Sequence, residues 1–340
     1  MGNGFSGRRD LKGVGPVNLG FGLIGLGRHG SRYARHLLDG IPGCHLAAVS
    51  RRDAVAGQAF ADRHGIMFLE NWRDLVVRPE VSAVLVVTPP VLNREICLSA
   101  AGAGKSLLIE KPLALTAADA EVMIQAVRAA GVRLMTAHTL RFTPVLRRLR
   151  ERLPDVGTLD CLTLTMRAER PPHEWLGDPA LAGGGVLIEI GVHLLDLIRY
   201  LTGEEVVEVS AGLTRRHTSR VEDMAHAWFV LTSGCRCCVE VSRVSGGRLC
   251  RVEAVGRAGQ LIADVDRGML SRIEGRNVVE TDVIPDQPTI VMVLEEFARS
   301  LAAGTPVPVS GEDGLRAVAM VEACYRSARE GRPILVPVPT

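Results

Sequence analysis

Short apolar runs alternate with helix-length segments over the first part of this chain, and this alternation constrains the fold most. Candidate strands lie at 17–24, 45–50, 66–69, 83–88, 106–110 and 133–136. Segments long enough for helices fill the gaps between them. Parallel strands need such long crossover connections, so the alternation predicts a parallel sheet covered by helices. We therefore expect a doubly wound α/β domain over residues 17–140.

A glycine-rich loop joins the first expected strand to the first expected helix. It consists of Gly25, Leu26, Gly27, Arg28, His29 and Gly30. Gly25 permits a tight turn, Gly27 lets the backbone approach a pyrophosphate, and Gly30 lets helix and strand pack closely. The amino terminus of the helix then faces the anion. Because strand and helix flank it correctly, we interpret the loop as a Rossmann dinucleotide-binding fingerprint, with these six residues binding the cofactor.

The end of the second strand distinguishes between the two pyridine dinucleotides. An acidic residue about 20 positions beyond the fingerprint binds the ribose of NAD. This chain has Ser50, Arg51 and Arg52 there. A hydroxyl and an arginine fork suit a 2′-phosphate, which favours NADP(H) over NAD(H). The alternative is a pair of exposed arginines ahead of a helix capped by Asp53.

Lys111 follows the buried-looking strand 106–110 within the tripeptide Glu110-Lys111-Pro112. Ligands of open α/β sheets bind beyond the carboxyl ends of the strands, which makes this ammonium group a catalytic candidate. The alternative is a solvated lysine in a loop.

The second half of the chain has a different pattern. Alternating apolar runs at 158–167, 225–231, 237–244, 251–255 and 261–265 are separated by turn signals, which indicates antiparallel strands. Helix-length segments lie at 142–153, 186–201, 289–302 and 312–330. We therefore expect an α+β domain over residues 141–340, which binds substrate and mediates oligomerisation.

Composition narrows the classes of partner and compartment. The formal charge is +2, from 40 basic and 38 acidic residues, too small to indicate nucleic-acid binding. The eight cysteines are dispersed and lack metal-site spacing, so we expect no metal and a cytoplasmic location. No apolar run is long enough for a membrane span. Residues 1–16 read as a disordered tail.

Three ionisable residues follow the glycines at 183–185 in an otherwise apolar segment. Glu189 and His193 are four residues apart, and His193 and Asp196 are three apart. On one α-helix the three would share a face, where a carboxylate could fix the tautomer of the histidine. By itself this pattern is more often a structural cluster, but together with a cofactor-binding fold and Lys111 it indicates a proton-exchange site.

The glycine fingerprint, Glu110-Lys111-Pro112 and the Gly-Gly…Glu189…Gly191…His193 run resemble, in this order, the Gfo/Idh/MocA family. The likeness covers residues 18–335 and implies a Rossmann domain followed by an α+β domain on a large, mostly antiparallel open sheet. It also implies oxidation or reduction of a sugar, inositol or related polyol. In such an enzyme Lys111 would polarise the substrate oxygen and His193 would be the general acid/base.

The resemblance implies further site residues. Glu189 would occupy the place of the usual aspartate, and Thr88 and Pro89 would contact the nicotinamide through backbone groups. Substrate hydroxyls would meet Lys111, Glu189 and His193, together with Arg141, His173 and Trp175. Each of the last three has a structural alternative: a charge at a helix start, a polar loop residue and interdomain packing, respectively.

Three functional alternatives stay open. Relatives include enzymes that keep the cofactor bound throughout, either aldose-aldose oxidoreductases or NAD-dependent glycosidases. The third alternative is a nucleotide-binding regulator without catalysis, against which the presence of both Lys111 and His193 argues. An open sheet with an exposed face would suit a homodimer or homotetramer.

Overall fold

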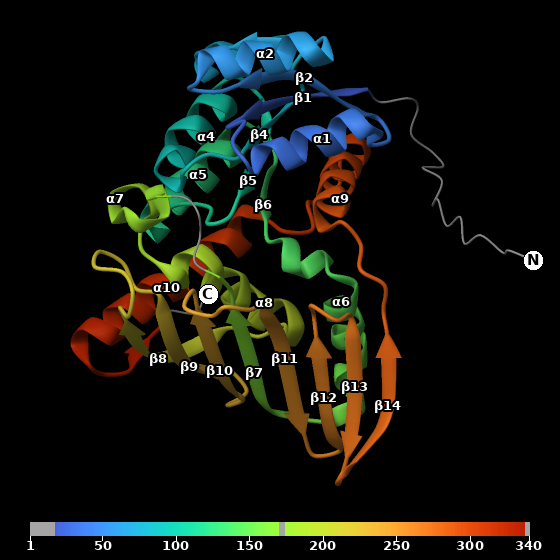
Figure 1. Cartoon of the computed structure of the whole chain (residues 1–340), viewed down its shortest axis with the longest axis vertical. Helices are drawn as coiled ribbons and strands as arrows, with labels where there is room; N and C mark the ends of the chain where they lie inside the picture. The colour runs from blue at the N-terminus through green and yellow to red at the C-terminus, as the bar shows by residue number, and fades with distance from the viewer. Residues whose placement is uncertain (1–17, 170–173, 337–340) are drawn as a thin grey trace, which may run out of the picture.

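Two domains, each built on its own β-sheet, make up the computed structural model of the chain, which describes residues 18–169 and 174–336 (Figure 1). The first sheet has six strands and the second has nine. This confirms the predicted combination of a Rossmann domain and a mostly antiparallel α+β domain. The predicted tail over residues 1–16 lies outside the described residues.

The first sheet is parallel throughout, in the order β3-β2-β1-β4-β5-β6. Its strands are β1 (Leu19–Ile24), β2 (Cys44–Ser50), β3 (Met67–Leu69), β4 (Ala83–Val86), β5 (Ser106–Glu110) and β6 (Leu134–Ala137). The helices between them are α1 (Gly30–Gly40), α2 (Ala54–His64), α3 (Trp72–Val76), α4 (Asn93–Gly102) and α5 (Ala117–Ala129). The strand order reverses direction beside β1, at the point where such sheets bind dinucleotides.

The second sheet has the order β14-β13-β12-β11-β7-β10-β9-β8-β15. Its strands are β7 (Leu159–Arg167), β8 (Val206–Thr214), β9 (Met224–Leu231), β10 (Arg236–Ser242), β11 (Leu249–Gly256), β12 (Gly259–Asp264), β13 (Met269–Glu274), β14 (Asn277–Val283) and β15 (Ile334–Leu335). All pairs are antiparallel except β7 with β10.

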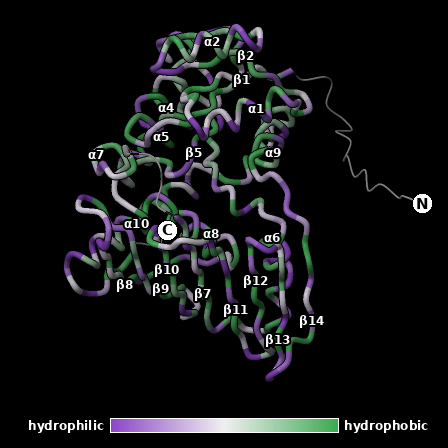
Figure 2. Tube along the Cα trace, in the orientation of Figure 1, coloured by the Kyte–Doolittle hydropathy of each residue, from purple (hydrophilic) through white to green (hydrophobic). Residues whose placement is uncertain are grey.

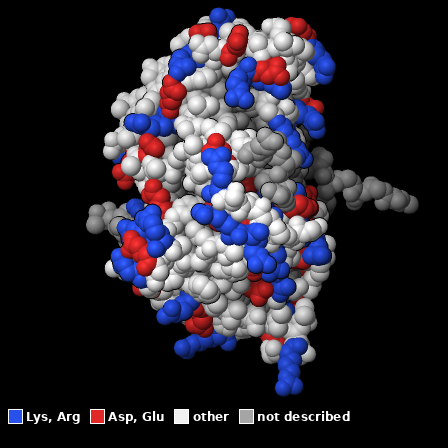
Figure 3. Space-filling view, turned by 60° about the vertical axis from the view of Figure 1, so that its left-hand side comes forward, with Lys and Arg blue, Asp and Glu red and all other residues white. Residues whose placement is uncertain are grey.

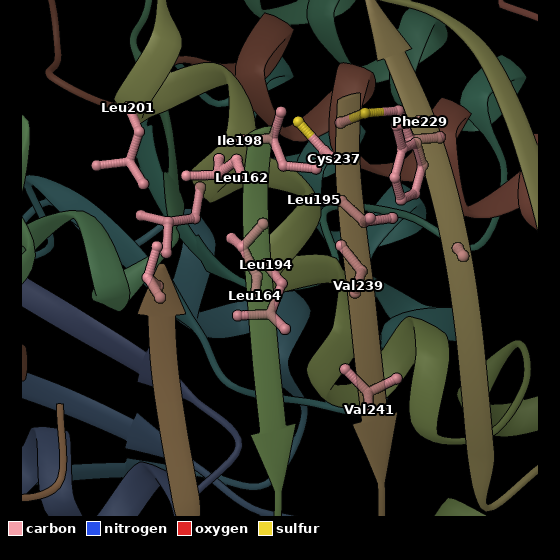
Figure 4. Close-up of a cluster of buried hydrophobic side chains, with 14 of the residues drawn as sticks. Leu162, Leu164, Leu194, Leu195, Ile198, Leu201, Phe229, Cys237, Val239 and Val241 are labelled. Atoms are coloured by element: carbon pink, nitrogen blue, oxygen red, sulfur yellow. The ribbon is translucent and has the colours of Figure 1, made fainter. Parts of the chain in front are cut away.

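Helices cover one face of this sheet and leave the other open (Figure 1). The covering helices are α6 (Pro144–Arg152), α8 (Val192–Thr202) and α10 (Gly311–Glu330), whereas α7 (Pro179–Ala182) lies beside the first domain. Along α8, Leu194, Leu195 and Ile198 pack on side chains of β7, β9 and β10 (Figure 4). These apolar contacts hold α8, and with it His193, against the sheet.

One helix from the carboxyl-terminal part returns to the first domain. The helix α9 (Thr289–Ala303) buries Leu294 and Phe297 in the same core as Phe21 of β1, and the rings of Phe21 and Phe297 lie 6.1 Å apart. Dividing the chain at residue 140 therefore assigns α9 to the wrong core. The apolar face of α9 predicts a buried helix but not which sheet it covers, because periodicity carries no information on the partner.

Hydropathy and charge follow this architecture. Figure 2 shows hydrophobic residues along the interior strands and helices, and hydrophilic residues at the tip of the β13–β14 hairpin. Basic and acidic side chains are interspersed over the face shown in Figure 3. Within the described residues, one helical stretch, Pro179–Thr202, is long and apolar enough to cross a membrane, but 78% of its apolar 18-residue window is buried inside the fold. We interpret it as a core segment.

Candidate active site

The glycine loop has the geometry that a dinucleotide requires. Gly25 has a φ of +100°, and a Cβ on it would lie 2.2 Å from the carbonyl oxygen of Val87. A Cβ on Gly30 would lie 1.9 Å from the carbonyl oxygen of Gly25, whereas one on Gly27 would meet nothing within 4 Å. Gly27 thus has room for a ligand against its backbone. No side chain caps the amino end of α1, so no side chain competes with a pyrophosphate for this helix end.

The side chains of this loop have unequal roles. Leu26 is buried in the core, so only its backbone can contact a ligand, while Arg28 is exposed. His29 donates from Nε2 to Oε1 of Glu110 at 2.8 Å, and the hydroxyl of Tyr33 donates to the same oxygen at 2.5 Å. The carboxylate at the end of β5 is therefore tied to the first turn of α1.

The three residues predicted to bind cofactor at the end of β2 have different surroundings. Ser50 is buried, and its hydroxyl donates to the carbonyl of Glu70 at 3.4 Å. Arg51 makes a long ion pair with Asp53 at 3.5 Å, and Arg52 is exposed. Asp53 caps α2 by accepting from the N–H of Ala56. The two arginines are therefore the groups at this strand end that can reach a ligand.

Lys111 connects the two domains. Its Nζ donates to the backbone carbonyl oxygen of Glu189 at 2.5 Å. Asn93 holds the loop that follows Lys111, because its amide donates to the carbonyls of Pro112 and Leu113 at 3.1 and 3.2 Å. The hydroxyl of Thr88 in turn donates to Asn93 at 3.3 Å. Asn93 was not among the predicted site residues. Its position in the first turn of α4 was the only feature of the sequence that could have pointed to it.

The carbonyl that Lys111 binds belongs to a π-helical turn, η5 (Leu187–Gly191), which runs directly into α8. Glu222, from the β8–β9 connection, caps the start of this turn. Its buried carboxylate accepts from the N–H groups of Gly185 and Leu187 at 3.0 and 3.1 Å and from the hydroxyl of Tyr325 at 2.8 Å. Sequence reasoning missed Glu222 because its partners are more than thirty residues away.

The predicted pairing of His193 with a carboxylate on its own helix is wrong. Glu189 forms a bidentate ion pair with Arg243, whose Nε lies 3.0 Å from Oε2. Asp196 forms one with Arg141, at 2.8 and 2.6 Å. The π-turn changes the helical spacing after Glu189, and arginines from distant strands and loops satisfy both carboxylates.

Arg141 is buried and contacts a second carboxylate, that of Asp313, at 3.0 Å. Its guanidinium therefore joins α8 to α10, and its contact with substrate stays a prediction. Trp175 is half-buried on the short helix η4 (Glu174–Gly177), and its contact with substrate stays a prediction. His173 lies outside the described residues.

His193 is buried near the start of α8, with 9% of its surface exposed. The ring of His138, just beyond β6, lies 6.0 Å from it between centroids and at 81° to it. His138 follows its strand as Lys111 follows β5, and this shared position at the carboxyl ends of parallel strands could have revealed it.

The electrostatics of this group follow from burial. Burial raises the pKa of Glu110, but the hydrogen bond and charge of His29 and the charge of Lys111 outweigh it, so the pKa lies below its usual range. Burial lowers the pKa of Lys111. Burial, together with Lys111, His138 and His29, holds the pKa of His193 well below its usual value. At neutral pH His193 is therefore a neutral ring able to accept a proton.

Two families of known sequence match this chain. Residues 19–138 match the family described as "Oxidoreductase family, NAD-binding Rossmann fold". Residues 147–262 match the family described as "GFO/IDH/MocA C-terminal domain". The two matches fall on the two observed domains. Among the described residues, no group of three or more His, Cys, Asp or Glu side chains is placed to hold a metal ion.

Individual relatives are similar over nearly their whole length. Myo-inositol 2-dehydrogenase of Thermotoga maritima is 30% identical over 337 residues, which cover 92% of this chain and 97% of the relative. A solved oxidoreductase domain protein from Kribbella flavida is 26% identical with a TM-score of 0.87, covering 95% and 100% of the two chains. The structure of an aldose-aldose oxidoreductase from Caulobacter crescentus, complexed with glycerol, is 28% identical with a TM-score of 0.85, covering 94% and 99%.

Proposed function

Because this chain belongs to the Gfo/Idh/MocA oxidoreductase family, we propose that it oxidises or reduces a carbinol or ketone carbon of a sugar, an inositol or a related polyol, with Lys111 and His193 as the polar catalytic pair. The observation that carries the proposal is the contact between Lys111 Nζ and the carbonyl of Glu189, which lies three residues before the start of α8 and four residues before His193. This contact brings an ammonium group from one domain beside a buried histidine from the other.

His193, Lys111 and Glu189 each have a different role in the proposed hydride transfer. When bound, the pyridine dinucleotide supplies or accepts the hydride. In the direction of oxidation, neutral His193 accepts the hydroxyl proton of the substrate, while Lys111 stabilises the negative charge that develops on the oxygen. In the direction of reduction, His193 returns the proton. Glu189 orients Lys111 through its backbone carbonyl, and its carboxylate is held by Arg243.

We further propose that NADP(H) is preferred over NAD(H). Arg51 and Arg52 directly follow Ser50, the last residue of β2, so two basic residues stand where an NAD enzyme usually has an acidic one. Asp53 is engaged in capping α2, which keeps its carboxylate at the helix start. An arginine fork pairs with phosphate through two charge-assisted hydrogen bonds, whereas the ribose hydroxyls of NAD gain nothing comparable from it.

The open face of the second sheet supports self-association as a dimer or tetramer. Trp228 of β9 is 57% exposed, and Val278 of the edge strand β14 is 62% exposed. A large aromatic side chain on an uncovered sheet face is typical of an interface. We also propose a cytoplasmic location, since the eight cysteines are free thiols.

The test is a panel of sugars, inositols and their keto forms, assayed with NAD and NADP in parallel. Product is measured separately from nicotinamide absorbance. We expect turnover by the intact protein and a loss of about 1000-fold or more in Lys111→Ala, since a positioned charge contributes a large share of the rate. Unchanged turnover in that variant would exclude the assigned site.

The aldose-aldose alternative gives a different result in the same panel. The 28% identity to the Caulobacter crescentus enzyme makes it the second candidate. Product formation with no net change in nicotinamide absorbance would establish an enzyme that retains its cofactor between two half-reactions. Dinucleotide binding with no product from any compound would instead indicate a nucleotide-binding regulator.

A further inference from the structure

His138 is a buried polar side chain that the proposed chemistry does not use. It follows β6 directly and is 1% exposed. Neither Nδ1 nor Nε2 has a hydrogen-bond partner within the described part of the chain. Burying an unpaired polar group costs about 1–3 kcal/mol, so a ring with two such atoms calls for an explanation.

The surroundings of His138 connect it to His193. The two rings lie edge to face with centroids 6.0 Å apart, and Nδ1 of His193 also has no partner among the residues described. On its other side, Nδ1 of His138 lies 3.9 Å from Oδ2 of Asp196. Arg141 fixes this carboxylate through two hydrogen bonds. A line of polar groups thus runs from His193 through His138 to Asp196.

A histidine that exchanges a proton with substrate needs its other ring nitrogen to be fixed, because the hydrogen bond there selects the tautomer. Glu189 and Asp196, the carboxylates expected to do this, are held by Arg243 and Arg141. The nitrogen to be fixed is Nδ1 of His193, which is buried without a partner among the described residues, and the ring of His138 lies edge to face with the ring of His193. We propose that His138 is a positioning residue that holds His193 in the Nδ1–H tautomer, leaving Nε2 to face the substrate.

The proposed link between the two rings runs through one bridging water. At a centroid separation of 6.0 Å the two rings are too far apart for a direct hydrogen bond, but they suit a single bridging water. Such a water needs two to four polar partners, and the unpaired nitrogens of both rings supply them. The carboxylate of Asp196, 3.9 Å from Nδ1 of His138, favours a proton on that nitrogen through its charge, which leaves Nε2 of His138 as the acceptor for the bridge.

The test measures the tautomer of His193 directly and needs no substrate. Protein labelled with ¹⁵N-histidine is examined by NMR at neutral pH, and the His193 signals are assigned by their loss in His193→Gln. His138→Phe keeps an aromatic ring, though a larger one, and removes both nitrogens, while His138→Gln keeps one donor and one acceptor. Thr136→Val is the matched control, since it removes a buried hydrogen bond from the same strand without altering either ring.

We expect the Nδ1–H tautomer in the intact protein and in Thr136→Val, a mixture of tautomers in His138→Phe, and partial recovery in His138→Gln. With the best substrate of the panel, kcat of His138→Phe should fall about 10- to 100-fold, with KM changed less than about twofold, because only proton transfer is impaired.

Three results would overturn the proposal: an Nε2–H tautomer in the intact protein, the same tautomer in His138→Phe as in the intact protein, or an equal change in Thr136→Val. If His138→Phe fails to fold, His138→Leu replaces it in the same comparison. The catalytic part rests on the proposed function, whereas the tautomer is measured without turnover. A chain that converts no compound therefore refutes the function and still decides the role of His138.

Discussion

Replacing Glu222 should loosen the helix start that carries the site. In Glu222→Ala, the N–H groups of Gly185 and Leu187 and the hydroxyl of Tyr325 lose a buried acceptor. Each stranded donor costs about 1–3 kcal/mol, so the free energy of unfolding should fall by about 3 kcal/mol or more. Glu222→Gln keeps the shape and one acceptor oxygen, and should lose roughly half as much.

The matched control is Tyr325→Phe. It removes one of the three hydrogen bonds and leaves the carboxylate capping both backbone groups, so we expect a loss of about 1 kcal/mol. Urea denaturation followed by fluorescence gives the free energies, and kcat reports whether the carbonyl of Glu189 still positions its lysine partner. A loss below about 1 kcal/mol in Glu222→Ala would refute the argument that this carboxylate holds the turn.

The remaining predictions concern pH and cofactor choice. Burial lowers the pKa of both His138 and His193 in the folded protein. As pH falls, these two rings are therefore protonated in the unfolded chain before they are protonated in the folded one. The free energy of unfolding should therefore fall as pH drops below about 6.5, by up to about 1.4 kcal/mol per pH unit for each ring, and urea titrations with His138→Phe should show a smaller fall. Burial also lowers the pKa of Lys111, so the fall of kcat/KM at basic pH should begin below the usual lysine pKa of 10.5. Arg243→Met should move this fall to higher pH, because it removes a neighbouring cation that lowers the same pKa. A fall at the same pH in that variant would contradict the assignment to Lys111. Arg51→Ala should raise the KM for NADP by about 10-fold and leave that for NAD unchanged; a wild-type preference for NAD would contradict the assignment.

Local sequence signals were enough for the parallel sheet of the first domain. The glycine loop and the end of β5 were correctly placed, because a strand, a tight turn and a helix start are each determined by adjacent residues. The strands β8, β13 and β14 were missed. β14 is exposed along nearly its whole length, so it carries little alternation between apolar and polar residues.

The site required contacts that no local pattern encodes. A helical face predicted that His193 would pair with Glu189 or Asp196, but Arg243 and Arg141, each more than fifty residues distant, satisfy those carboxylates. Pairing across such a separation depends on the register of β10 and on how the two domains pack. Single-sequence reasoning can therefore find the ionisable groups of such a site without finding which of them bind one another.

The return of α9 to the first core has a mechanical consequence. The chain passes between the two domains before α6, again before α9, and once more between α9 and α10. These three crossings act as covalent tethers between the domains, whereas a chain that passes only once from one domain to the next has a single tether. A wide hinge opening would therefore have to strain all three tethers or pull α9 out of the core of the first domain. Small sliding movements of one domain along the other would leave all three tethers unstrained.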